Sequence, residues 1–374
     1  MRPTGKLHLG NYMGALHNWV KLQHEYECYF FIADYHALTT DYADTANLKS
    51  NIREVILDFL AAGLDPAVST LFVQSDVKAH FELHTLLSMI TPLSWLERVP
   101  TYKDQQEQLK EKDLATYGFL GYPLLQSADI LLYKPDYVPV GADQVAHVEL
   151  TREVARRFNQ FFPGEFYLAP NAAPWEMGAI EEKARKLAGD KTKTTFSAHE
   201  LYEAAHQTKK LTGGFGRREI LPEPDVLLTP SPKLPGTDGR KMSKSYGNTI
   251  LLSDPEPEIR SKLKTMVTDP ARIRRDDPGN PDVCPVFDLH KVFTTEETQQ
   301  KVREGCTTAG IGCIECKGWL ADAVVEHLKP MQERRRHYEA NFVEVEAILN
   351  QGAARAAVRA NQTMQEVRNA VGLR

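Results

Sequence analysis

The sequence has no long apolar run and few cysteines. No stretch approaches the ~20 apolar residues that a membrane helix needs, and the N-terminus lacks the apolar core of a signal peptide. Only five of the 374 residues are cysteine, which is too few for a disulfide scaffold. These absences argue against a membrane protein and a disulfide-rich secreted protein, so we expect a cytoplasmic protein with no membrane partner.

The sequence also has no strong excess of charge of one sign. Its 45 basic and 50 acidic residues give a formal net charge of -5. Any contact with nucleic acid therefore has to come from local basic patches. The length predicts two or three domains with real hydrophobic cores.

A lysine loop, G-T-D-G-R-K-M-S-K-S, occupies residues 236–245. Lys241 and Lys244 carry flexible point charges, which can follow a phosphate whose charge moves during a reaction. Gly236 and Gly239 allow the backbone to turn. Many loops with two lysines are merely solvated, but a second signature at the N-terminus favours a phosphate site.

That second signature is M-R-P-T-G-K-L-H-L-G-N, residues 1–11, a loop that leads into a helical pattern. A helix N-terminus offers free N–H donors, and His8 beside it can hydrogen-bond a phosphate or a ribose. Taken alone, this motif is more often an ordinary turn. Together with the lysine loop it indicates a nucleotide site.

The next segments predict a strand at 27–38, a helix at 45–64 and a second strand at 69–77. This order is the βαβ unit of an α/β, Rossmann-like parallel sheet. Ligands of such sheets bind at the carboxyl ends of the strands, so we expect Asp34 and His36 to face the active cleft.

The two signatures resemble those of the class I aminoacyl-tRNA synthetases, H-I-G-H and K-M-S-K-S, with Asn11 in place of the last histidine. Further stretches narrow the resemblance to the tryptophanyl-tRNA synthetases. The resemblance implies a tryptophan–tRNA ligase that activates L-tryptophan with ATP and Mg²⁺, transfers it to tRNA(Trp), and forms a homodimer. The alternatives are a tyrosine-type synthetase and a non-charging paralogue that binds tryptophan or RNA.

The resemblance also implies which residues form the site. Catalysis is assigned to His8, Lys241, Ser243 and Lys244. The ATP-binding set is Gly5, His8, Gly10, Asn11, Lys103, Asp143, Lys241, Met242, Ser243 and Lys244. The tryptophan-binding set is His36, Tyr122, Gln126, Asp129, Val140 and Gln144.

Asp129 is the one acid in an otherwise apolar helical pattern at residues 122–133. Burying a carboxylate is costly unless a donor meets it. If this helix lines the amino-acid pocket, Asp129 can accept the indole N–H, the only polar group of the tryptophan side chain. A substrate without that N–H would leave the acid unpaired, which discriminates better than pocket shape. A helix-capping or salt-bridged acid is the alternative.

Residues 170–222 depart from the family pattern and contain two weakly amphipathic segments, at 175–187 and 199–211. A solvated, partly disordered excursion is the leading interpretation, and contact with tRNA or a partner is the alternative. In the resembled family a strand precedes the first signature, and we expect its absence to reflect a trimmed or misassigned start. The predicted catalytic domain is 1–167 with 226–253, the insertion, partly helical or disordered, is 168–225, and the helical anticodon-binding domain is 254–374.

Four cysteines fall in the predicted helical domain with the spacing C-x21-C-x6-C-x2-C: Cys284, Cys306, Cys313 and Cys316. Four thiolates can hold one metal centre, but the spacing does not separate zinc from an iron–sulfur cluster. A subset of tryptophanyl-tRNA synthetases has a [4Fe-4S] cluster with nearly this spacing. The resemblance therefore favours a [4Fe-4S] cluster, with zinc as the alternative.

Overall fold

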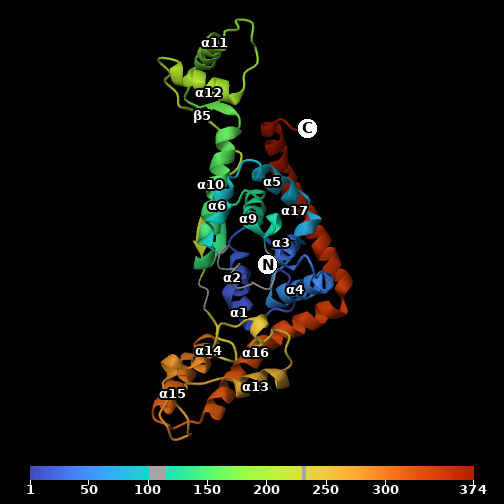
Figure 1. The fold of residues 1–374 in the computed structure, drawn as a ribbon, viewed down its shortest axis with the longest axis vertical. Helices are drawn as coiled ribbons and strands as arrows, with labels where there is room; N and C mark the ends of the chain where they lie inside the picture. Colours follow the sequence, from blue (N-terminus) through green and yellow to red (C-terminus); the bar gives the residue numbers. More distant parts are fainter. Residues whose placement is uncertain (101–114, 230–232) are drawn as a thin grey trace. The chain divides into compact units, whose positions relative to one another are not determined.

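The structure is a computed structural model that describes residues 1–100, 115–229 and 233–374. The chain forms two compact units (Figure 1). Unit 1 comprises Met1–Asp76 and Leu228–Arg355, and unit 2 comprises Val77–Leu227 and Ala356–Arg374. The domain limits expected from the sequence stay a prediction.

A parallel strand pair lies in unit 1. Strand β1 (Cys28–Ile32) pairs with β2 (Ser69–Val73) along the full length of both strands. Every residue of β2 is buried, as expected of a parallel strand that is covered on both faces. The connecting helix α4 (Leu48–Ala62) ends at Gly63, whose φ of 109° suits glycine. The predicted strand–helix–strand order is therefore present, but the first strand ends at Ile32, and residues 34–38, predicted as its end, belong to helix α3 (Asp34–Asp41).

Helices make up most of the remainder of unit 1. They begin with α1 (Leu9–Asn11), η1 (Tyr12–Leu16), α2 (His17–Leu22), α3 (Asp34–Asp41) and η2 (Gln74–Asp76). After the lysine loop come η4 (Lys244–Tyr246), α13 (Glu256–Thr265), η5 (Pro281–Val283), α14 (Pro285–Phe293), α15 (Glu296–Thr307), α16 (Cys313–Ala340) and α17 (Phe342–Val371), which continues into unit 2. In the described ranges, no helix combines the length and apolar character needed to cross a membrane.

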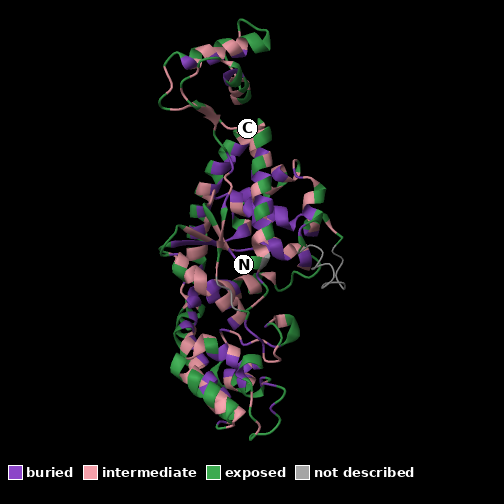
Figure 2. Cartoon of the chain, turned by 90° about the vertical axis from the view of Figure 1, so that its left-hand side faces the viewer, coloured by how far each residue is buried: buried purple, intermediate pink, exposed green. Residues whose placement is uncertain are grey.

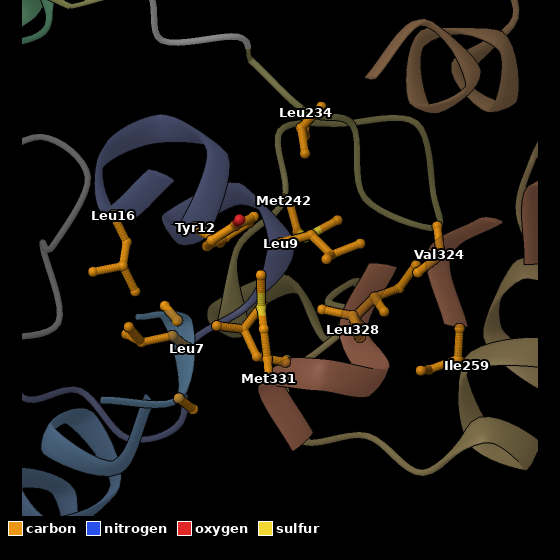
Figure 3. Close-up of a cluster of buried hydrophobic side chains, with 14 of the residues drawn as sticks. Leu7, Leu9, Tyr12, Leu16, Leu234, Met242, Ile259, Val324, Leu328 and Met331 are labelled. Carbon is orange, nitrogen blue, oxygen red and sulfur yellow. The ribbon is translucent and has the colours of Figure 1, made fainter. Parts of the chain in front are cut away.

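One hydrophobic cluster joins segments of unit 1 that are far apart in the sequence (Figure 3). Each buried side chain of this kind contributes ~1.5–3 kcal/mol. The labelled residues are Leu7, Leu9, Tyr12 and Leu16 from the first segment, Leu234 and Met242 from the lysine-loop segment, Ile259 from α13, and Val324, Leu328 and Met331 from α16. Both signature loops therefore rest on the same core as α16.

A buried ion-pair group fastens the first loop to α16. Asp58 of α4 is fully buried and accepts a hydrogen bond from the Leu7 N–H at 2.6 Å. Its other oxygen pairs with Arg335 of α16, which also pairs with Glu54 and Glu339. Removing one partner would leave an uncompensated buried charge, so this group constrains the residue directly before His8.

Unit 2 is built around packed helices. Helix α9 (Tyr122–Leu131) packs against α5 (Ala79–Ser88) and α10 (Val145–Phe161). Strand β3 (Tyr137–Val140) pairs with β6 (Asp225–Leu228), and the short elements are α6 (Leu93–Glu97), α8 (Tyr117–Leu120) and η3 (Ala142–Gln144).

The inserted segment of unit 2 has its own small fold. Helices α11 (Glu176–Ala188) and α12 (Ala198–Gln207) lie where the amphipathic segments were predicted, and β4 (Phe166–Leu168) pairs antiparallel with β5 (Phe215–Arg217). Few of its residues are buried (Figure 2). Its interpretation as a loose excursion stays a prediction.

A buried glutamate ties the insertion together. Glu176 accepts hydrogen bonds from the hydroxyl and N–H of Thr212 and from the N–H groups of Ala173 and Gly213. The bond from the Thr212 hydroxyl is the largest cause that lowers the pKa of Glu176, to about 2. The carboxylate therefore joins the start of α11 to the segment that follows α12.

The backbone of α17 approaches β2 so closely at Gly352 that a Cβ there would lie 1.7 Å from the carbonyl oxygen of Leu71. We predict that Gly352→Ala lowers the free energy of unfolding by about 1–3 kcal/mol, because the helix must move away from the strand. The measurement is the urea midpoint followed by circular dichroism. Gly318→Ala in α16 is the matched control. Nothing lies within 4 Å of its added Cβ, so this change should be neutral or stabilise by up to about 1 kcal/mol. A Gly352→Ala protein as stable as the control would contradict the prediction.

Candidate active site

His8 caps the first helical segment of the chain. The Asn11 N–H donates to His8 Nδ1 at 3.2 Å, and the His8 N–H donates to Asn11 Oδ1 at the same distance. Because Nδ1 accepts, the neutral imidazole carries its proton on Nε2. The bond from Asn11 therefore leaves the Nε2–H of His8 as the donor that can bind a ligand.

A short antiparallel ladder joins the His8 loop to the segment that follows the lysine loop. His8 forms a bridge with Leu251. The Leu9 N–H donates to Ile250 O, and the Leu252 N–H donates to Leu7 O, both at 2.9 Å. This ladder brings residues that are more than two hundred positions apart into one site.

Gly10 and Met242 form the contact between the two loops. Met242 is 3% exposed, and its Cβ would lie 3.5 Å from a Cβ added at Gly10. The same added atom would lie 3.0 Å from the His8 ring, so a side chain at residue 10 would press on His8. Any larger residue would therefore require the His8 ring to shift by a few tenths of an ångström.

Lys244 lies against the first loop. Its Nζ donates to the carbonyl oxygen of Thr4 at 2.9 Å and to the Thr4 hydroxyl at 3.3 Å. Gly5, with φ of 94°, is close enough that an added Cβ would lie 3.8 Å from this nitrogen. Ser243 bonds to Ser245 through their hydroxyl groups at 2.9 Å, and the Lys241 side chain is on an exposed residue.

Asn248 holds the lysine loop from within, and the sequence analysis missed it. It is 2% exposed, accepts from the Ser243 N–H, and donates to Asp238 and to the Lys241 carbonyl. The sequence feature that could have identified Asn248 is its position directly after Gly247, which has φ of 65° and ends η4. A small amide in such a turn often bonds to nearby backbone groups.

Burial and positive neighbours change the protonation of the site. Burial, and to a smaller extent the charges of Lys244 and Lys241, together lower the pKa of His8 to about 4. Burial also lowers the pKa of Lys244 to about 8, against an opposing effect of Asp58. Near pH 7 the site therefore presents a neutral imidazole and a charged Lys244, which suits a polyphosphate.

Three of the predicted tryptophan-binding residues lie on α9 of unit 2. Asp129 is 4% exposed, and its Oδ1 lies 2.7 Å from Nδ1 of His80, a residue of α5. The other ring nitrogen of His80 lies 2.8 Å from the Tyr133 hydroxyl. Asp129 is thus buried among polar partners, and neither His80 nor Tyr133 was singled out from the sequence.

Gln126 lies one turn before Asp129 and bonds to another buried histidine. Its Oε1 lies 2.5 Å from Nδ1 of His147 on α10, whose ring centroid is 5.6 Å from that of Tyr122. Tyr122 and Val140 are each 9% exposed. Gln144 ends η3 and is half-buried. The predicted tryptophan-binding residues of unit 2 therefore lie on α9, at the end of β3 and at the end of η3.

Some predicted site residues lie outside both the signature loops and the α9 group. His36 is buried in α3 of unit 1. Asp34, which precedes it, accepts from the Ser75 N–H at 3.0 Å and so joins the ends of β1 and β2. Asp143 lies in η3. Lys103 lies outside the described residues.

All four predicted metal ligands line one cavity of about 20 Å³ in unit 1. Burial and the three other cysteines raise the pKa of Cys316 to about 12. A guanidinium N–H of Arg272 donates to Cys306 Sγ at 3.7 Å, and His290 Nε2 lies 3.4 Å from Cys316 Sγ. Within the described residues, no three histidine, cysteine or acidic side chains are placed to hold a metal ion. The structure therefore groups the cysteines and leaves the metal itself a prediction.

Comparison with known proteins places these features in a family. The family model of class I tRNA synthetases for tryptophan and tyrosine matches residues 1–177 and 190–329. A tryptophan–tRNA ligase of Ralstonia nicotianae is 49% identical over 396 residues, covering 100% of this chain and 97% of the relative. One of Thermotoga maritima is 47% identical over 375 residues, covering 100% and 98%.

Solved structures agree with the sequence relatives. A tryptophanyl-tRNA synthetase of Campylobacter jejuni, solved with ADP and tryptophan, has a TM-score of 0.77 and 30% identity, covering 100% of this chain and 98% of that one. The predicted α/β class, a Rossmann-like catalytic region followed by a helical C-terminal region, is confirmed. The chain belongs to the class I tRNA synthetases of the tryptophan and tyrosine family.

Proposed function

We propose that the chain is a tryptophan–tRNA ligase. It joins L-tryptophan to ATP as tryptophanyl-adenylate, releases pyrophosphate, and transfers the amino acid to tRNA(Trp). The observation that carries the proposal is the buried carboxylate of Asp129 in a chain that is 49% identical to a tryptophan–tRNA ligase over its whole length. An acid in that place suits a ring that carries a single N–H.

The signature loops of unit 1 would perform the activation step. The tryptophan carboxylate attacks the α-phosphorus, and negative charge develops on the leaving pyrophosphate. Such a reaction needs positioning and charge neutralisation more than a protein nucleophile. The Nε2–H of His8 and the ammonium groups of Lys241 and Lys244 are donors of the right kind, and Mg²⁺ would neutralise further phosphate charge.

Lys244 would change partners during this step. Its ammonium group bonds to the Thr4 carbonyl and hydroxyl, which are neutral acceptors. A phosphate oxygen is a stronger, charged acceptor. ATP would therefore draw Lys244 from Thr4, with the glycines of the loop allowing the backbone to move.

Amino-acid-dependent exchange between ATP and pyrophosphate tests the proposed substrate. We predict that the chain supports exchange with L-tryptophan at a kcat/KM at least about 10³-fold above that with L-tyrosine. Purified tRNA(Trp) should then be charged. Exchange with tyrosine instead would indicate a tyrosine-type synthetase, and exchange without charging would indicate a non-charging paralogue.

Lys244→Ala should lower the rate of activation by about 10²–10³-fold, because a donor to the developing charge is lost. Its effect on tryptophan affinity should be much smaller. Pre-steady-state formation of the adenylate and equilibrium binding of tryptophan measure the two quantities. Lys329→Ala, at an exposed site of α16, is the control. Equal losses in rate and affinity would mean that the loop mainly shapes the pocket.

The pH dependence of activation provides a separate test of Lys244. The free enzyme loses the charge of Lys244 as the pH rises through its lowered pKa of about 8. We therefore expect kcat/KM for ATP to fall above that pH. Lys244→Arg should abolish this fall at a lower overall rate, since arginine stays charged. His8 has a pKa of about 4, so no inflection should occur near the usual histidine value of about 6.5. A fall above pH 8 that persists in Lys244→Arg would assign it to another group.

We also propose that Cys284, Cys306, Cys313 and Cys316 hold a metal centre, a [4Fe-4S] cluster in preference to zinc. Support comes from their shared cavity, its apolar walls at Val286, Phe287 and Val302, and the nearby cation of Arg272. The cavity of about 20 Å³ has room for little more than one water molecule. Since no three of these side chains are placed to hold a metal ion, either centre would require the thiol groups to move, and the larger four-iron cluster would require the larger movement.

Metal analysis of anaerobically purified protein separates the two cases. We predict about four iron and four acid-labile sulfide per chain, lost in Cys306→Ser. Cys28→Ser, in β1, is the control and should keep the metal. Stoichiometric zinc without iron would rule out the cluster.

The homodimer stays a prediction from the family resemblance. Large apolar side chains are exposed on α5 and in the segments that follow it, at Phe81, Met89 and Leu93. Sedimentation equilibrium of the purified chain measures the oligomeric state directly.

A further inference from the structure

A chain of three buried polar side chains ends at Asp129. His80 Nδ1 lies 2.7 Å from Asp129 Oδ1, and His80 Nε2 lies 2.8 Å from the Tyr133 hydroxyl. His80 is fully buried, and Asp129 and Tyr133 are 4% and 7% exposed. His80 belongs to α5, Asp129 belongs to α9, and Tyr133 follows α9. The chain therefore crosses between two packed helices inside unit 2.

The proton positions in this chain follow from the chemistry of its groups. An ionised carboxylate only accepts hydrogen bonds, so the proton between His80 and Asp129 lies on His80 Nδ1. In a neutral imidazole the other nitrogen then accepts, and the Tyr133 hydroxyl donates to it. Both bonds thus run in one direction, from Tyr133 through His80 to Asp129.

This arrangement restricts the orientation of the Asp129 carboxylate. The terminal torsion of an aspartate is broad and is not fixed by the side chain itself. The bond from His80 fixes the position of one oxygen. An ionised carboxylate has about four lone-pair positions, so it can accept a further N–H while it stays bonded to His80. With little water to compete, the direction of such a bond matters.

We propose that His80 is a positioning residue for the choice of amino acid. It orients Asp129 to accept the indole N–H of tryptophan, and Tyr133 holds His80 in the tautomer that donates to the carboxylate. The inference rests on the proposed activation of tryptophan. It extends the determinants of specificity from the acid itself to two residues behind it.

Two substitutions of His80 separate positioning from simple packing. The amide nitrogen of asparagine takes the place of imidazole Nδ1, whereas that of glutamine takes the place of Nε2. His80→Asn therefore keeps the donor to Asp129, and His80→Gln loses it. Both variants are polar and neither adds a charge, so a role in packing alone predicts no systematic difference between them.

The readout is the ratio of kcat/KM for tryptophan to that for its benzothiophene analogue, in which sulfur replaces the N–H. Wild-type enzyme should favour tryptophan by about 10³-fold or more. His80→Asn should keep this ratio within about threefold, and His80→Gln should lower it by about tenfold or more through the KM for tryptophan. Tyr133→Phe should lower it by about twofold to fivefold, because the tautomer is no longer fixed.

The same ratio in His80→Asn and His80→Gln, or a wild-type ratio in His80→Gln, would overturn the inference. Asp129→Ala, measured in the same assay, distinguishes this from failure of the proposed function. If the wild-type enzyme activates no tryptophan, or if Asp129→Ala keeps the wild-type ratio, the assigned substrate contact is wrong. For a variant too slow to assay, calorimetric affinities for the two amino acids give the ratio.

Discussion

The backbone ladder between Leu7–Leu9 and Ile250–Leu252 is the interaction on which the signature site depends. It consists of only two backbone hydrogen bonds around the His8–Leu251 bridge. These bonds are few, but the hydrophobic cluster beneath them holds both segments against α16 (Figure 3). The ladder joins the His8 loop to the segment that follows the lysine loop, and Lys244 reaches Thr4 of the same first loop through its side chain.

Three buried carboxylates have different kinds of partners that offset the free-energy cost of their burial. Asp58 pairs with Arg335 and accepts the Leu7 N–H, so it fastens one loop to a helix. Glu176 accepts mainly backbone and hydroxyl bonds and closes the insertion. Asp129 Oδ1 lies 2.7 Å from Nδ1 of His80, on the neighbouring helix α5. All three carboxylates therefore join segments that lie far apart in the sequence.

The sequence predicted the helices and strands whose apolar residues recur with a clear period. It also predicted the residues whose side chains can bind a ligand or a metal. The parallel strand pair, α4 and α9 agree with the residue patterns of their segments, and the four cysteines predicted to share a metal centre line one cavity. Helix α14 was missed because its nine residues begin at Pro285 and carry a short pattern.

The supporting polar residues could not be predicted in this way. His80 and Asp129 are 49 residues apart, and nothing in the local pattern around His80 separates it from other helical histidines. Asn248 is likewise an ordinary turn residue until its bonds to Ser243 and Asp238 are seen. Signature motifs identify groups that meet a ligand, whereas the groups that hold them in place are identified only by the fold.

The bonds between Lys244 and Thr4 also mean that Thr4 competes with any ligand for the ammonium group of Lys244. Under the proposed function, a phosphate that binds Lys244 would replace a carbonyl and a hydroxyl of the protein, which are always present at a fixed effective concentration. The free energy available from the new charge-assisted bond is reduced by the bonds that are given up. A weak ligand would therefore leave Lys244 bonded to Thr4. A triphosphate, which has several charged oxygens, would replace Thr4 as the partner of Lys244.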